Sequence, residues 1–299
     1  MKRPCYVVDA FSDRAFAGNP AGVVLDAADL PAAVLQRIAA ELKHSETAFP
    51  GAAREPQATF HLRWFTPTAE VRFCGHATLA TLHVLAAEAQ RISVPPDEPV
   101  RIAFTCKAGL LGAELSRSGG KLRAIFETPP TRFVAQPVPA EALAAMNLVP
   151  EALDPRVPAQ KAASDEGSLY LCLRDRQALA RARPDGRQLE EMGQRLGVGG
   201  FVPFVLAPGA GVDAALRAFF PGCGIEEDPV TGIASGHLAL LVQQVRPGAL
   251  PRRLLFTQGD EVGRPGRVEI ELRGAPSGEV RAWITGAATV TLRGELDLR

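Results

Sequence analysis

The chain has 299 residues, which suits one large domain or two domains of medium size. Hydrophobic residues make up 46% and charged residues 22%, an ordinary balance for a globular protein of enzyme size. The 33 Lys and Arg residues equal the 33 Asp and Glu residues in number. No excess of positive charge favours a nucleic-acid partner, and we expect none.

Signals for secretion or membrane insertion are missing from the sequence. Asp9 interrupts the apolar run near the N-terminus before a signal-peptide core could form. No stretch approaches the roughly 18 apolar residues of a membrane helix. The cysteines are odd in number, scattered and without a Cys-x-x-Cys pair: Cys5, Cys74, Cys106, Cys172 and Cys223. We therefore expect a reduced, cytoplasmic protein with no membrane partner.

The first half of the chain combines strand-like segments with one amphipathic helix. Residues 5–11 and 22–27 are rich in β-branched residues and predict strands. Residues 29–42 predict a helix that Asp29 can cap, with Pro31 in its first turn. The apolar stripe of this helix consists of Val34, Ile38 and Leu42. Further strands are predicted over residues 58–65, 100–104 and 121–127.

The second half repeats this combination. Residues 187–197 predict a helix that Gly197 closes. Residues 267–272 and 280–285 predict strands. Between the halves, the Pro-rich stretch 129–158 is predicted to be the crossover.

An internal duplication is visible at an offset of about half the chain. Leu-Arg-Trp-Phe-Thr-Pro at 62–67 matches Leu-Arg-Ala-Phe-Phe-Pro at 216–221. Gly-His-Ala-Thr at 75–78 then matches Gly-Ile-Ala-Ser at 232–235, and each run leads into an apolar segment. Two further matches follow in the same order, a Phe-Thr pair at 104 and at 256, and a β-rich segment at 121 and at 279. This order indicates two similar halves.

The two Gly-x-Ala runs are candidates for anion binding. The first turn of a helix offers N–H groups without intrahelical partners and a partial positive charge. Glycine there allows a ligand close to the backbone. Two such helix starts, facing each other across a cleft, would hold a small carboxylate. The alternative is that the small residues only let a central helix pack tightly within a sheet.

Glu46 raises a question of its own. It follows a charged helix end and precedes the apolar pair Ala48 and Phe49. A single carboxyl group can isomerise a substrate by taking a proton from one carbon and returning it to another, provided that apolar surroundings raise its pKa. The alternative is a solvated carboxylate at a helix end.

A family resemblance rests on several of these segments. Phe-Ser-Asp-Arg-Ala-Phe-Ala-Gly-Asn-Pro at 11–20, Ser-Glu-Thr-Ala-Phe at 45–49, Cys-Gly-His-Ala-Thr at 74–78 and Asp-Pro-Val-Thr-Gly at 228–232 resemble the PhzF-like phenazine-biosynthesis family, in that order. This family belongs to the wider diaminopimelate-epimerase-fold group. The resemblance covers residues 5–299.

The resemblance implies an α+β fold of two pseudo-symmetric halves, each a β-barrel-like sheet around a central helix, with the active site between them. We expect residues 1–128 to form the half that carries Glu46 and His76, with 287–299 as a segment that can return to it. Residues 129–286 are expected to form the half that carries Asp228.

The resemblance also implies cofactor-independent isomerisation. In the founding member of the family a proton moves on a dihydro-hydroxyanthranilate ring, and the Glu of the Ser-Glu-Thr-Ala-Phe motif is the acid and base. That role carries onto Glu46, and further catalytic roles carry onto His76 and Asp228. His76 would be a neutral hydrogen-bond partner or a proton relay. Asp228, extended because it precedes Pro229, would accept from a substrate amino or hydroxyl group. Substrate contacts are expected at Asn19, Gly75, Ala77, Thr78, Gly232, Ile233, Ala234 and Ser235.

The chain departs from the family pattern at Ile233, where a Ser usually follows the Gly. The loss of this hydroxyl donor indicates a more apolar ligand than the founding substrate, although Ser235 lies two residues further on. The substrate is therefore expected to be a small, cyclic carboxylate of unassigned identity.

Two alternatives remain open. Racemases of this fold group use two opposed cysteines, and Cys74 resembles one of them, but the segment 228–232 contains no cysteine. A second alternative is a small-acid-binding protein that has lost its chemistry.

Cofactor motifs are not found in the sequence. His44 and Glu46 imitate the His-x-Glu of zinc deaminases, but no Pro-Cys-x-x-Cys follows. His76 and His83 lie on similar faces of one predicted helix without a visible third ligand. The Gly-rich run at 197–200 lacks a dinucleotide-binding layout. We expect no metal and no cofactor, and the family resemblance points to a homodimer.

Overall fold

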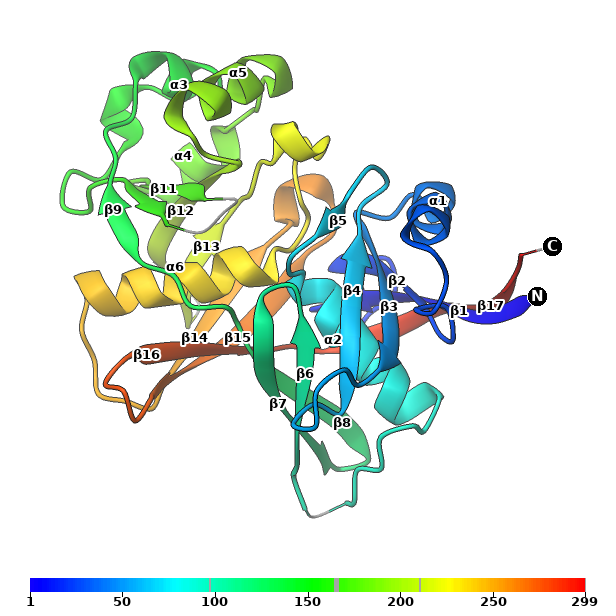
Figure 1. Ribbon diagram of the computed structural model, residues 1–299. Helices are drawn as coiled ribbons and strands as arrows, with labels where there is room; N and C mark the ends of the chain where they lie inside the picture. Colours follow the sequence, from blue (N-terminus) through cyan, green and yellow to red (C-terminus); the bar gives the residue numbers. More distant parts are fainter. Residues whose placement is uncertain (97, 164–166, 210, 299) are drawn as a thin grey trace. The chain divides into compact units, whose positions relative to one another are not determined.

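The computed structural model describes residues 1–96, 98–163, 167–209 and 211–298 and divides into two compact units. The first unit consists of Met1–Pro129 together with Trp283–Arg299, and the second of Pro130–Ala282. Figure 1 shows the chain as a ribbon coloured along the sequence.

The first unit is built of strands around one short helix. Its strands are β1 (Lys2–Ala10), β2 (Asn19–Val24), β3 (Glu46–Ala52), β4 (Phe60–Phe65), β5 (Glu70–Val71), β6 (Val100–Cys106), β7 (Gly109–Ser118), β8 (Lys121–Glu127) and β17 (Ala288–Asp297). The end of β16 (Val280–Thr285) joins them by pairing with β8. Its helices are α1 (Ala32–Leu42), α2 (Gly75–His83) and the π-helical turn η1 (Val84–Glu88).

The second unit repeats this arrangement with additional helices. Its strands are β9 (Phe133–Ala135), β10 (Gln160–Ala162), β11 (Ser168–Cys172), β12 (Gly200–Gly209), β13 (Val212–Leu216), β14 (Arg252–Gln258), β15 (Gly266–Gly274) and the start of β16. Its α-helices are α3 (Ala140–Ala144), α4 (Arg176–Arg181), α5 (Gly186–Leu196) and α6 (Gly232–Val245). Short 3₁₀ turns occur at η2 (Pro150–Ala152), η3 (Pro221–Cys223) and η4 (Asp260–Val262).

The strand pairings confirm the two pseudo-symmetric halves. In the first unit β1–β2 is antiparallel, β2–β3 parallel, β3–β4 antiparallel, β4–β6 parallel and β6–β7 antiparallel. In the second unit β10–β11, β11–β12, β12–β13, β13–β14 and β14–β15 follow with the same directions in the same order. The matched segment 62–67 begins within β4, and its counterpart 216–221 begins at the last residue of the equivalent strand β13.

One helix in each unit is buried by the strands. Every residue of α2 from Gly75 to Leu82 is buried, and α2 contacts β1, β2, β3, β8 and β17. Nine residues of α6 are buried, and this helix packs on β15. A helix that is apolar all round has no solvent-facing side, so both helices occupy central positions. Figure 1 shows α2 behind β3, β4 and β6.

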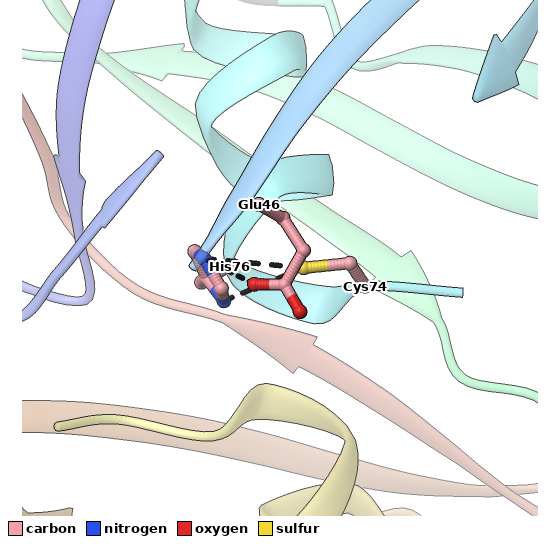
Figure 2. Close-up of side chains that lie close together, drawn as sticks. All are labelled: Glu46, Cys74 and His76. Carbon is pink, nitrogen blue, oxygen red and sulfur yellow. Dashed lines mark hydrogen bonds and ion pairs between the residues drawn. The ribbon is translucent and has the colours of Figure 1, made fainter. Parts of the chain in front are cut away.

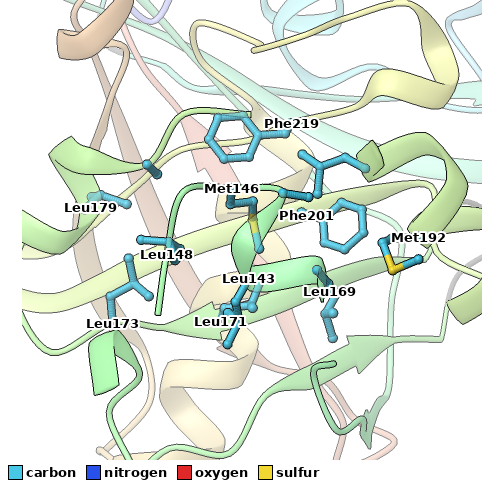
Figure 3. Packing of buried hydrophobic residues seen from close by; sticks show 14 of the residues in the cluster. Leu143, Met146, Leu148, Leu169, Leu171, Leu173, Leu179, Met192, Phe201 and Phe219 are labelled. Carbon is cyan, nitrogen blue, oxygen red and sulfur yellow. The ribbon is translucent and has the colours of Figure 1, made fainter. Parts of the chain in front are cut away.

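Separate apolar cores hold the outer helices. In the second unit, Met146 and Leu143 from around α3 pack with Leu171 of β11 and Phe219, as Figure 3 shows. In the first unit, Leu35 and Ile38 of α1 pack on strand residues that include Phe49. Burial of such side chains supplies the main stabilisation of each unit, about 25 cal/mol for each Å² of apolar surface removed from water.

One local prediction was wrong, and one was incomplete. Asp29 does not cap α1, because the helix begins only after Pro31, and Asp29 instead lies 3.7 Å from the Arg3 guanidinium. The stretch 129–158 is not merely a connection, because β9 and α3 form within it and Leu143 lies in the core. The helix end at Gly197 is confirmed, with Gly197 in the left-handed conformation at φ 62°. Within the described residues, none of the helices combines the length and apolar character needed to span a bilayer.

Candidate active site

Glu46 lies at the beginning of a strand and not at a helix end. Helix α1 stops at Leu42, and Lys43 reverses the chain with φ 57°. Glu46 then opens β3, where it pairs with Ala21 of β2. Its side chain is only 14% exposed, and its Oε2 lies 3.3 Å from Nε2 of His76. The carboxylate is therefore held within the unit, directed at the start of α2, as Figure 2 shows.

His76 is the second residue of α2 and is almost completely buried, at 3% exposure. Burial, with a smaller contribution from the nearby charge of His44, lowers the pKa of His76 from 6.5 to about 3. The imidazole is therefore neutral at physiological pH. The 3.3 Å contact between its Nε2 and Glu46 Oε2 therefore joins a neutral ring to a carboxyl group and is not an ion pair, since only an imidazolium would carry the positive charge.

The neighbours of His76 select one tautomer. Asn19 Nδ2 lies 3.2 Å from Nδ1, which accepts the amide hydrogen. The ring proton then resides on Nε2, where the Ser45 hydroxyl at 3.2 Å is its hydrogen-bond partner and Glu46 Oε2 lies 3.3 Å away. Ser45 and Asn19 thereby fix the orientation of the neutral imidazole beside the Glu46 carboxyl group.

Cys74 completes this cluster. It is the residue before α2, 5% exposed, with Sγ 3.4 Å from Nδ1 and 3.9 Å from Nε2 of His76. One ligand atom from each of Glu46, Cys74 and His76 can be chosen so that all three lie within 4.8 Å of one another (Figure 2). Such a trio of carboxylate, thiol and imidazole has the residue types of a metal site, which the sequence did not lead us to expect.

The other expected contacts at α2 lie in the first turn of the helix. Gly75, Ala77 and Thr78 are all buried. The Thr78 hydroxyl donates to the Cys74 carbonyl at 2.6 Å, so its hydrogen is used within the helix. The first-turn backbone N–H groups are what this segment can offer to an anion.

Asp228 lies in the second unit, where it is 5% exposed and precedes α6. Its Oδ2 accepts a 2.5 Å hydrogen bond from the Thr231 hydroxyl. Gln258 secures the same turn, because its Nε2 donates to the Asp228 carbonyl and its Oε1 accepts from the Thr231 N–H. Sequence reasoning missed Gln258, which lies 27 residues after Thr231 and shares no motif with it.

The first turn of α6 contains the remaining expected contacts. Gly232, Ala234 and Ser235 are buried, whereas Ile233 is partly exposed. The Ala234 carbonyl accepts from the Tyr170 hydroxyl at 3.4 Å. Ile233 therefore presents an apolar side chain at the outer face of this turn.

A buried ion pair, which the sequence analysis also did not predict, fixes the segment that precedes α6. Arg217 donates to both carboxylate oxygens of Glu227 and to the carbonyls of Leu179 and Ala182. Its guanidinium also lies over the Phe219 ring. Glu227 is thus fixed immediately before Asp228.

Comparison with known proteins identifies relatives that share this architecture. The chain is 32% identical over 301 residues to an uncharacterized isomerase, YddE, of Salmonella typhimurium, covering 99% of this chain and 98% of that protein. A PhzF-family phenazine biosynthesis protein from Enterococcus faecalis has a TM-score of 0.76 and 31% identity, with both chains fully covered. A hydroxyproline epimerase from Agrobacterium vitis, with bound trans-4-hydroxy-L-proline, matches 99% of this chain and 93% of its own at a TM-score of 0.68 and 12% identity, which shows the fold alone.

The duplicated sheet-and-helix architecture and these relatives define an isomerase with the diaminopimelate-epimerase-like fold. The family described as "Phenazine biosynthesis-like protein" matches residues 8–294, and the chain belongs to that family. Membership in an isomerase family argues against the alternative of a non-catalytic binding protein.

Proposed function

We propose that the protein moves a proton between two carbons of a small, cyclic carboxylate, with Glu46 as the acid and base and with no cofactor. The observation that carries the proposal is the 3.3 Å contact between Glu46 Oε2 and His76 Nε2 at a side-chain exposure of 14% for Glu46. A carboxylate on the protein surface would be more exposed to solvent and would not lie beside a buried, neutral imidazole.

The reaction follows from this arrangement in two steps. The Glu46 carboxylate takes a proton from a substrate carbon, which leaves the electron pair delocalised into the adjacent unsaturated system. The resulting carboxylic acid returns a proton to a different carbon, so atoms and charge balance without a redox partner. The neutral His76 ring lies 3.3 Å from the carboxyl group, and Asn19 and Ser45 hold the ring by hydrogen bonds.

Further groups are proposed to bind the substrate. The first turns of α2 and α6 offer backbone N–H groups to its anionic substituents. The partly exposed Ile233 favours an apolar edge on the substrate rather than a hydroxyl. Asp228 is kept as a proposed catalytic residue that accepts from a substrate amino or hydroxyl group. The hydrogen bond that Asp228 accepts from the Thr231 hydroxyl gives Asp228 a structural role as well.

Deuterium incorporation tests the proposal. The protein is incubated in D2O with small cyclic hydroxy- and amino-acids, including dihydroaromatic ones, and mass spectrometry detects deuterium bound to carbon. We expect incorporation with the wild type and its loss in Glu46→Gln. The matched control is Glu41→Gln, since Glu41 is an exposed carboxylate on α1. Incorporation that survives in Glu46→Gln would refute the role of Glu46.

A second candidate is a racemase or epimerase that uses Cys74. The observation in its favour is the 3.4 Å approach of Cys74 Sγ to His76 Nδ1, which places the thiol in the same cluster as the Glu46 carboxyl group at the start of α2. Cys74→Ser separates the candidates, with Cys106→Ser as the buried control outside the cluster. Loss of incorporation in Cys74→Ser with retention in Glu46→Gln would favour the racemase.

The proposal includes a cytoplasmic homodimer. None of the five cysteines is bridged to another in a disulfide, which is the arrangement expected in a reducing compartment. Analytical ultracentrifugation tests the dimer, and a sedimentation mass of one chain at micromolar concentration would exclude it.

A further inference from the structure

We infer that Glu46, Cys74 and His76 form a binding site for a soft divalent cation such as Zn²⁺. The three residues supply a carboxylate oxygen, a thiol sulfur and an imidazole nitrogen, which together are typical zinc ligands. The inference goes beyond the proposed isomerase chemistry, which uses no metal.

The separations between the ligand atoms suit one central ion. Around a tetrahedral Zn²⁺, with bonds of about 2.0 to 2.3 Å, neighbouring ligand atoms lie roughly 3.3 to 3.6 Å apart. His76 Nε2 lies 3.3 Å from Glu46 Oε2 and 3.9 Å from Cys74 Sγ. The oxygen and nitrogen are already at coordination spacing, and all three ligand atoms lie within 4.8 Å of one another, so the sulfur has to approach the other two to complete the coordination.

The local fold holds the ligands in place before a metal arrives. Cys74 and His76 are two residues apart at the rigid start of α2, and Glu46 opens the neighbouring strand β3. Both ligands on α2 are nearly buried, at 5% and 3% exposure. A site in which three side chains already converge loses little conformational entropy when it binds an ion.

The surroundings of His76 provide a partner for the metal-bound tautomer. Ligation through Nε2 requires the ring proton on Nδ1, and metal-bound histidines usually donate that hydrogen to a carbonyl or carboxylate. Asn19 lies at hydrogen-bond distance from Nδ1, and rotation of its amide presents the oxygen instead of the nitrogen. The Ser45 hydroxyl, 3.2 Å from Nε2, lies near the fourth coordination position, which water can also fill.

The ligand set determines which cations fit. A thiolate with an imidazole prefers Zn²⁺ and similar transition metals over Mg²⁺ and Ca²⁺, which require oxygen ligands. On binding, the Cys74 thiol loses its proton to solvent, and a Zn–S bond replaces the S–H bond. No oxidation or reduction takes place.

Occupation of this site would inhibit the isomerase. The metal would take the Glu46 oxygen that is proposed to receive the substrate proton, and it would replace the Nε2–H of His76. This consequence rests on the proposed function, whereas metal binding itself does not.

Cobalt spectroscopy provides the test, because Co²⁺ bound to a thiolate gives a charge-transfer absorption in the near ultraviolet that does not depend on substrate. The exposed Cys223 is first changed to Ser, so that its thiol cannot bind cobalt. The chelator-treated Cys223→Ser protein is titrated with Co²⁺, and Zn²⁺ is then added. We expect one equivalent of thiolate-bound cobalt, which Zn²⁺ displaces.

Two further variants locate the site in this background. Cys74→Ser should abolish the charge-transfer band, while Cys106→Ser should retain it. Outer-shell changes alone weaken metal sites roughly 10- to 100-fold, so loss of a ligand in Glu46→Gln should weaken cobalt binding at least that much. Glu46→Gln also keeps the test valid if Cys74→Ser does not fold.

The outcomes separate the two proposals. No charge-transfer band in the parent, or a band that persists in Cys74→Ser, overturns the metal site whatever the activity. A band with the expected variant pattern supports the metal site even if Glu46 proves not to be the base. Where deuterium incorporation is measurable, stoichiometric Zn²⁺ should suppress it and a chelator should restore it.

Discussion

Acidification should destabilise the first unit through His76. The folded-state pKa of His76 is about 3, whereas an unfolded chain restores its ordinary value of 6.5. Below pH 6.5 the His76 imidazole therefore binds a proton in the unfolded state but not in the folded state. The resulting stability is present above pH 6.5 and is lost as the pH falls toward 3.

The size of the effect follows from these two pKa values. Between about pH 7.5 and about pH 5, the unfolded state gains about 2 kcal/mol from protonation of this one imidazole, while the folded state gains almost nothing. His76→Asn removes the titrating group. The variant should therefore lose about 2 kcal/mol less stability than the wild type over the same pH interval.

Urea denaturation followed by tryptophan fluorescence measures this difference. Both tryptophans, Trp64 and Trp283, belong to the first unit, so the signal reports the unit that contains His76. Other titrating groups contribute equally to both proteins and cancel. His44→Asn is the control, because His44 is the smaller cause of the pKa shift and its removal should leave most of the pH dependence. Parallel pH profiles for wild type and His76→Asn would refute a buried, neutral His76.

Two further changes test the second unit by circular dichroism during urea unfolding. Arg217→Ala leaves the buried Glu227 carboxylate without its cation and should cost roughly 3 to 5 kcal/mol, and a cost below about 1 kcal/mol would contradict the buried ion pair. Asp185→Ala removes the side-chain acceptor of the Gln188 N–H at the start of α5 and should cost about 1 kcal/mol. The control Glu190→Ala, at an exposed position of the same helix, should change stability by less than about 0.5 kcal/mol, and equal effects of the two changes would exclude a capping role.

The architecture was largely predictable because it repeats. Leu62 and Leu216, which open the matched segments, lie on the equivalent strands β4 and β13, and the segment 121–127 forms β8 with the predicted bounds. Local patterns of this kind carry the information because β-branched residues and turn residues act over a few positions. Asp29 failed as a cap because Pro31 delays the helix by one turn, which a capping pattern alone does not specify.

The geometry of the candidate site was less predictable. Glu46 and His76 are 30 residues apart, and their contact depends on how β3 passes the start of α2. The motifs identified both residues but not the tautomer of His76, which Asn19 selects across 57 positions. Gln258 and Arg217 were not predicted from the sequence, because only the folded chain brings them to their hydrogen-bond partners.

The central claim is that one carboxyl group, Glu46, both removes and returns the proton. The most direct measurement uses a substrate found by the D2O screen and deuterated at the carbon that loses the proton, followed through a single turnover in H2O. The account predicts that part of the deuterium reappears on the second carbon, because the same partly shielded carboxyl group carries it. Complete loss of deuterium to solvent, with turnover that survives in Glu46→Gln and disappears in Cys74→Ser, would contradict it.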